Sequence, residues 1–146
     1  MGVVLNRRLE VTVADAVPAL AELVEDGAAL YQGGPVQTGS VLALADFHEP
    51  ALSAGLAFGS VGYLRGDEDP SALVGDVGAV RVFSGYSGWG PGQLEGEMER
   101  DDWIVVEAEP DDAFTDDPEG LWSLVLARKG GEYALLATMP PDPSQN

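Results

Sequence analysis

Cysteine is absent from this chain of 146 residues, and histidine occurs once, at His48. The absence of cysteine excludes disulfides, thiol catalysis and cysteine-ligated zinc or iron–sulfur centres. A single histidine excludes multi-histidine metal sites, so we expect no metal and no cofactor. A serine–histidine–aspartate triad would have to use His48. Its context, ADFHEPAL, is typical of the junction between two elements, and we interpret His48 as a surface or capping residue.

Basic residues are few: seven Lys and Arg stand against 25 Asp and Glu, for a net charge of −18. Proteins that bind DNA draw most of their affinity from Lys and Arg at the phosphates, so this charge argues against direct nucleic-acid binding and against anionic membranes. No apolar run reaches the roughly 18 residues that span a bilayer. No export signal is recognisable, and we expect a cytoplasmic protein.

The length fits one domain, which we assign to residues 1–146, with a frayed tail at 140–146. Hydrophobic periodicity and capping signals predict a mixture of strands and helices. Strands are predicted at 3–5, 41–45, 57–64, 79–84 and 103–108, and helices at 16–26, 70–74, 91–101 and 118–129. For the last helix, a hairpin of WSLVLA and YALLAT is the alternative. The DPE start and the RKG stop favour the helix.

The position of Pro18 limits where the first helix begins. If Thr12 capped this helix, Pro18 would remove an interior hydrogen bond. If Asp15 caps it, Pro18 lies in the first turn, where the amide has no helical partner anyway. We therefore predict a helix from Ala16 to Asp26, closed by Gly27.

The stretch FSGYSGWGPGQLEGE combines five glycines with a tyrosine and a tryptophan. We interpret it chiefly as a structural corner, in which glycine supplies positive φ angles and the two rings fill space, with their polar tips hydrogen-bonded. The alternative is an anion site at 85–92, between a strand and a helix start. The loop contains no phosphate-binding motif and no Lys or Arg, which argues against an anion site.

Three hypotheses about function follow. The first is a non-enzymatic protein that acts through an unidentified protein partner, with at most an indirect effect on transcription. The second is a module that binds a small molecule or anion at the glycine loop. The third, a hydrolase using Glu95 with Ser87 or His48, has the weakest support, because no catalytic motif joins these residues. The residues of the candidate ligand or interaction site are Asn6, Arg7, Arg81, Gly85, Tyr86, Gly88, Trp89, Gly90, Gly92, Gln93 and Glu95.

Five motifs together resemble those of the YqgE/AlgH family. They are GVVLNR, GGPVQ, RVFSGYSGWGPGQLEGEM, DWIVVEA and AFTDDPEGLW, and they cover nearly the whole chain. The resemblance implies an α+β fold with a bent mixed sheet, partly closed like a barrel and wrapped by several helices. It also implies a cytoplasmic bacterial protein without a settled activity. One branch of the family has been described as a transcriptional regulator of alginate production, and it lacks a known DNA-binding motif.

The sequence departs from the family pattern in two places. The pattern begins with a further strand and helix before GVVLNR, so the resemblance implies that part of the core is missing. Arg8 stands where the family usually has proline. Neither departure affects the glycine loop.

Overall fold

The computed structural model describes residues 1–139 and contains one six-stranded sheet. The expected tail at 140–146 lies outside the described residues. The strand order is β1-β2-β6-β3-β5-β4. The strands are β1 (Arg8–Thr12), β2 (Ala29–Gln32), β3 (Val36–Phe47), β4 (Gly55–Phe58), β5 (Val61–Tyr63) and β6 (Val77–Tyr86).

The sheet is mixed, because β2 and β6 run parallel while every other neighbouring pair is antiparallel. This confirms the predicted α+β class. The predicted partial barrel is wrong for the described part of the chain, where the sheet is open and ends in the edge strands β1 and β4. The long strands β3 and β6 form its centre and pair over most of their length, with register shifts where β3 bends.

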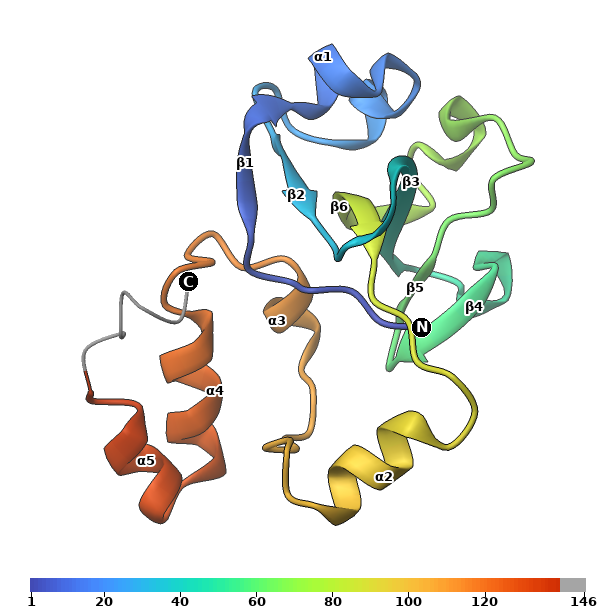
Figure 1. Cartoon of the computed structure of the whole chain (residues 1–146). Coiled ribbons are helices and arrows are strands. Elements are labelled where there is room, and N and C mark those ends of the chain that lie inside the picture. The colour runs from blue at the N-terminus through green and yellow to red at the C-terminus, as the bar shows by residue number, and fades with distance from the viewer. Residues whose placement is uncertain (140–146) are drawn as a thin grey trace.

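The helices gather mainly at one end of the sheet. Figure 1 shows α2, α3, α4 and α5 below and to the left of the strands, whereas α1 lies above them. Their bounds are α1 (Val13–Ala16), α2 (Gln93–Glu99), α3 (Pro110–Ala113), α4 (Leu121–Lys129) and α5 (Glu132–Leu136), and 3₁₀ turns occupy Pro18–Leu23, Pro50–Leu52 and Pro70–Leu73. Among residues 1–139, no helix has the length and apolar composition that crossing a bilayer requires.

Both faces of the sheet carry buried side chains. Successive residues of a strand point to opposite faces. Accordingly, Tyr31 and Phe83 belong to one core cluster with Ala113 of α3, and their chain neighbours Leu30 and Val82 belong to a second. Val13 of α1 and Ala43 of β3 complete the second cluster. The two-sided core fixes the register of β2 and β6, since a slip of one residue would exchange the clusters.

Pro18 divides the predicted helix at 16–26. Thr12 does cap a helix, accepting a bond from the Asp15 amide at 3.2 Å, but α1 ends at Ala16. Proline restricts the residue before it and cannot donate within a helix, so the chain turns at Val17 and continues as a 3₁₀ helix from Pro18. The predicted long helix is therefore wrong.

Several other boundaries also differ from the predictions. The predicted strand at 3–5 is absent; instead Gly2 pairs with Ser87 and the first strand is β1. The predicted strand at 57–64 is a hairpin, split at Gly59, whose φ is 52°. β2, α3 and α5 were not predicted. The strand at 79–84, the short helix capped by Asp69, and the helices at 91–101 and 118–129 are confirmed, within a few residues, by β6, the Pro70–Leu73 turn, α2 and α4.

Candidate protein-interaction site

The glycine run begins where two backbones cross in close contact. Gly85 has a φ of 71°, and a Cβ there would lie 2.5 Å from the Gly34 carbonyl oxygen. A Cβ on Gly33 or Gly34 would in turn overlap the backbone of Gly85 or Tyr86. Only glycine permits this approach on both sides, so GGPVQ and FSGYSG form one structural unit.

Beyond the corner, four side chains converge in what we call the Glu97 cluster: Trp89, Gln93, Glu97 and Trp103. The indole N–H groups of Trp89 and Trp103 both donate to Glu97 Oε2, at 3.2 and 2.7 Å. Gln93 Nε2 donates to Glu97 Oε1 at 3.1 Å. These bonds, that from Trp103 first, lower the pKa of the Glu97 carboxyl. The expectation that Trp89 has a hydrogen-bonded polar tip is confirmed, and its acceptor lies on α2.

The Glu97 cluster holds the start of a second feature, the apolar segment, which we define as Trp103–Val105. Its three side chains are 47%, 42% and 56% exposed. The strand predicted at 103–108 is wrong, because these residues pair with no strand. Within residues 1–139, no backbone amide of 103–108 has a hydrogen-bond acceptor. A sequence typical of a strand therefore lies at the surface, and its backbone amides have no acceptor within residues 1–139.

The far end of this stretch is held by α4. Lys129 Nζ donates to the Val105 carbonyl at 2.7 Å, and Arg128 Nη2 donates to the Glu107 carbonyl at 3.0 Å. Arg128 also forms a two-pronged ion pair with the buried Asp112, at 2.6 and 3.0 Å. This pairing lowers the pKa of Asp112 and raises that of Arg128. The stretch from Trp103 to Glu107 is thus held at both ends, and its amides have no acceptor among residues 1–139.

The predicted site residues divide into two groups. The corner and the start of α2 bring together Gly85, Tyr86, Gly88, Trp89, Gly90, Gly92 and Gln93, and Gly90 donates to Gln93 Oε1 at 3.1 Å. Glu95 is on α2, exposed, and has no hydrogen bond or ion pair within the described residues. Asn6 and Arg7 are exposed before β1. Arg81 points elsewhere: its Nη2 donates to the Thr115 carbonyl at 2.7 Å.

The arrangement offers little to an anion at the glycine loop. No residue of 85–92 lines the cavity beside Arg81 or the one beside Tyr63. The helix that follows, α2, has seven residues, too few for a strong helix dipole. The third hypothesis also lacks support, because no hydrogen bond or ion pair within residues 1–139 joins Glu95, Ser87 and His48, and the His48 ring nitrogen Nδ1 lies 3.2 Å from the Gly75 carbonyl oxygen.

Comparison with known proteins decides the family. An AlgH-like family model matches residues 1–134. The chain belongs to the YqgE/AlgH family. A UPF0301 protein of Streptomyces coelicolor is 41% identical over 152 residues, covering 100% of this chain and 79% of the relative. One from Mycobacteroides abscessus is 43% identical over 156 residues, covering 100% and 73%.

Two solved structures of similar proteins share the fold. The crystal structure of protein DIP2367 from Corynebacterium diphtheriae has a TM-score of 0.82 and 29% identity, covering 94% of this chain and 74% of that one. The solution structure of AlgH from Pseudomonas aeruginosa has a TM-score of 0.66 and 27% identity, covering 97% and 78%. The names of these YqgE/AlgH relatives state no reaction, so function has to be argued from the site.

In this YqgE/AlgH member, the residues that the sequence reasoning missed are Glu97, Trp103 and the cations of α4. Gln93 and Glu97 are four apart on a predicted helix, a spacing that signals contact. The WIVV run was predicted to be part of a strand at 103–108, not an exposed segment. Nothing in the sequence places Arg128 and Lys129 beside residues more than 20 positions earlier.

Proposed function

We propose that this YqgE/AlgH protein is a non-enzymatic interaction module that binds an extended, apolar and basic segment of a partner protein along the apolar segment. One observation carries the proposal. Trp103, Ile104 and Val105 are exposed on a stretch whose backbone amides have no acceptor within the described residues. Exposed apolar side chains beside unpaired backbone donors are what an added strand covers.

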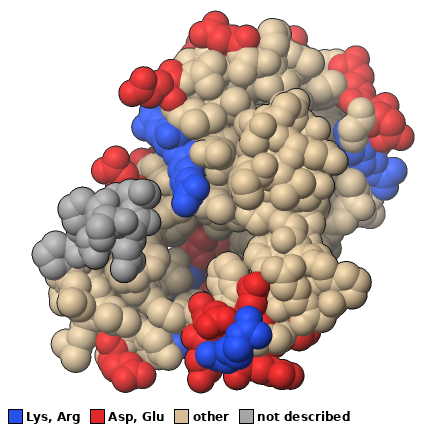
Figure 2. All heavy atoms as spheres, viewed as in Figure 1, with Lys and Arg blue, Asp and Glu red and all other residues tan. Residues whose placement is uncertain are grey.

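The acidic residues around the apolar segment indicate the kind of partner. The stretch is flanked by exposed acids, namely Asp101, Asp102, Glu107, Glu109 and Asp111. Figure 2 shows acidic side chains in several patches around the edge of the visible face and basic ones in fewer places. A second copy, also at −18, would be repelled, whereas a segment with Lys and Arg between its apolar residues would be attracted. Any effect on transcription would then act through this partner, and we infer a cytoplasmic location for both.

The proposal can be tested with defined peptides. The probe is KVKVKVKV, and KGKGKGKG keeps its charge but lacks the apolar side chains. Hydrogen exchange of the full chain should show amides 103–108 becoming protected with KVKVKVKV and not with KGKGKGKG. A strand that pairs there accepts hydrogen bonds from these amides, which slows their exchange.

Two variants provide the matched comparison. Ile104→Asp places a charge in the apolar segment and should abolish protection. Val41→Asp makes the same change at a residue of β3 with similar exposure, 45%, and should leave protection intact. Equal binding of both peptides, or equal loss in both variants, would show that only net charge is involved and would reject the proposal.

A further inference from the structure

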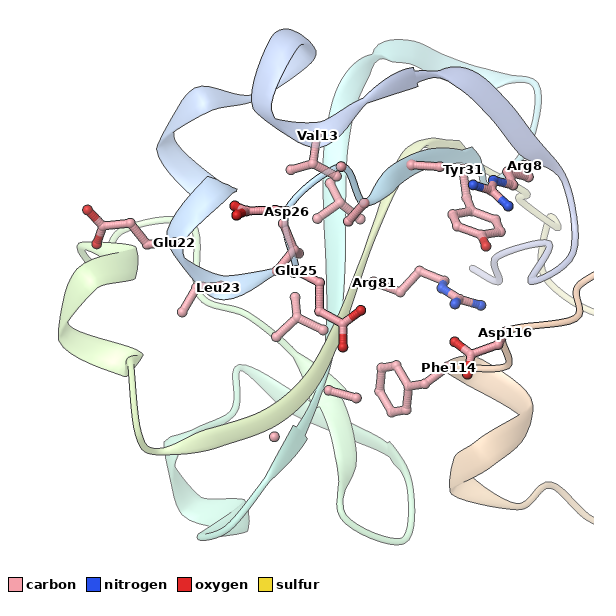
Figure 3. Close-up of a pocket in the computed structure, with 18 residues that line it drawn as sticks. Arg8, Val13, Glu22, Leu23, Glu25, Asp26, Tyr31, Arg81, Phe114 and Asp116 are labelled. Atoms are coloured by element: carbon pink, nitrogen blue, oxygen red, sulfur yellow. The ribbon is translucent and has the colours of Figure 1, made fainter.

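A second candidate site lies in a cavity of about 600 Å³. Figure 3 shows it between the turn that precedes β2, the first half of β6 and the chain around Phe114. None of the residues of the apolar segment lines it. This cavity is therefore independent of the proposed protein-binding site.

The guanidinium of Arg81 lies beside this cavity, and one of its two terminal nitrogens has no hydrogen-bond partner within residues 1–139. Its Nη2 bonds the Thr115 carbonyl, and its central carbon lies 4.3 Å from the centre of the Tyr31 ring. Its Nη1 is buried and has no hydrogen-bond partner among the described residues. Buried charged donors nearly always have partners, because an unpaired one is destabilising. Arg81 thus keeps hydrogen-bonding capacity that no group among residues 1–139 uses.

The surroundings indicate which acceptor. Arg8 lines the same cavity. Burial is the main cause that lowers the pKa of Arg81, and the positive charge of Arg8 lowers it further. Asp116 lies near enough to oppose that effect but forms no ion pair with Arg81. A guanidinium group favours a planar carboxylate, which accepts two bonds at once, and the positive charge of Arg8, which lines the same cavity, adds to the attraction. Nearby acids disfavour a doubly charged phosphate.

Those acids also suggest a positive group on the ligand. Glu25 and Asp26 are exposed and line the cavity, and Figure 3 shows the Glu25 carboxylate pointing toward the space beside Arg81 and Phe114. Val80 and Phe114 provide apolar surface between the charges. The cavity therefore contains positive, apolar and negative surfaces close together.

We infer that this cavity binds a small zwitterion with an apolar side chain, of the chemical class of the aliphatic amino acids. The carboxylate accepts from the guanidinium of Arg81, in the cavity that Arg8 also lines. The ammonium group faces Glu25. The side chain packs on Phe114 and Val80.

The probe is leucine, with three comparison ligands: 4-methylpentanoate, which lacks the ammonium group, 3-methylbutylamine, which lacks the carboxylate, and inorganic phosphate. Amide resonances at 22–29, 78–82 and 114–116 should shift saturably with leucine at millimolar concentration. Each analogue should bind about tenfold more weakly, since one charge-assisted contact is lost. Absence of a saturable shift, equal binding of 4-methylpentanoate, or tighter binding of phosphate would each overturn the inference.

Variants locate the two charges. Arg81→Met should weaken leucine binding at least about tenfold, whereas Arg65→Met removes the same charge outside this cavity and should have no effect. Glu25→Gln, at an exposed position, should weaken leucine binding without changing that of 4-methylpentanoate. If Arg81→Met does not fold, the Glu25→Gln pair of titrations decides alone. An unchanged leucine affinity in Glu25→Gln would overturn the inference.

Discussion

Trp89 and Trp103 meet edge to face, with ring centroids 5.9 Å apart and planes inclined by 64°. Both donate to Glu97 Oε2, so the glycine corner and the apolar segment share one carboxylate. The corner therefore has a consequence beyond packing. By seating Trp89 beside α2, it fixes where Trp103 lies and hence where the exposed Ile104 and Val105 begin.

The first prediction concerns this shared carboxylate. In a Trp122→Phe background, which removes the remaining tryptophan, Glu97→Gln should shift tryptophan emission to longer wavelength, because the indoles lose a charged acceptor and become more hydrated. Glu95→Gln, on the same helix, should leave the emission unchanged, since Glu95 accepts no hydrogen bond within the described residues. An identical spectrum for both variants would contradict the joint role of Glu97.

The second prediction concerns the backbone crossing. Gly34→Ala should lower the free energy of unfolding by about 1–3 kcal/mol, because its Cβ has to displace the backbone of Tyr86. Gly39→Ala is the control: it is exposed, and a Cβ there has no neighbour within 4 Å. Urea denaturation of both variants measures the difference. If the two lose equal stability, the crossing is looser than described.

The third prediction concerns pH. The hydrogen bonds from Arg128 lower the pKa of Asp112 in the folded chain. The ion pair therefore stabilises the fold at pH values above the pKa of an unfolded Asp, about 3.9. This contribution is lost as the pH falls through the lower pKa that Asp112 has in the folded chain. Asp112→Asn should cost about 1–3 kcal/mol at neutral pH. The gap to the parent chain should shrink below pH 4 in urea denaturation. A gap that stays constant with pH would exclude the ion pair as its cause.

The sequence predicted elements whose signals are local. Asp69 with Pro70, and Arg128-Lys129 with Gly130, mark helix ends by capping chemistry that acts within a few residues, and these helices are confirmed. β2 escaped prediction because it is short and runs directly into Gly33 and Gly34. The resemblance to the YqgE/AlgH family predicted the mixed sheet, but not that the described sheet stays open.

Contacts between distant residues could not be predicted. Arg81 was expected near the glycine loop because it is close to it in sequence, yet it bonds Thr115, 34 positions away. Adjacent positions on a strand point to opposite faces, so proximity along β6 says little about shared contacts. Glu95 was chosen over Glu97 for the candidate site, but the indole groups of Trp89 and Trp103, which the fold brings together, both donate to Glu97.

The failed strand at 103–108 leads to the last prediction. Alternation and β-branched residues indicate what a segment can form, but a strand exists only where another supplies its hydrogen-bond partners. In the free chain, amides 104–106 should therefore exchange with solvent far faster than amides 80–83, which lie in the centre of the sheet between β2 and β3. Hydrogen exchange followed by NMR measures both sets in one sample. Protection of 104–106 equal to that of β6 would mean that the segment already has a partner in the free chain, and no strand could then be added there.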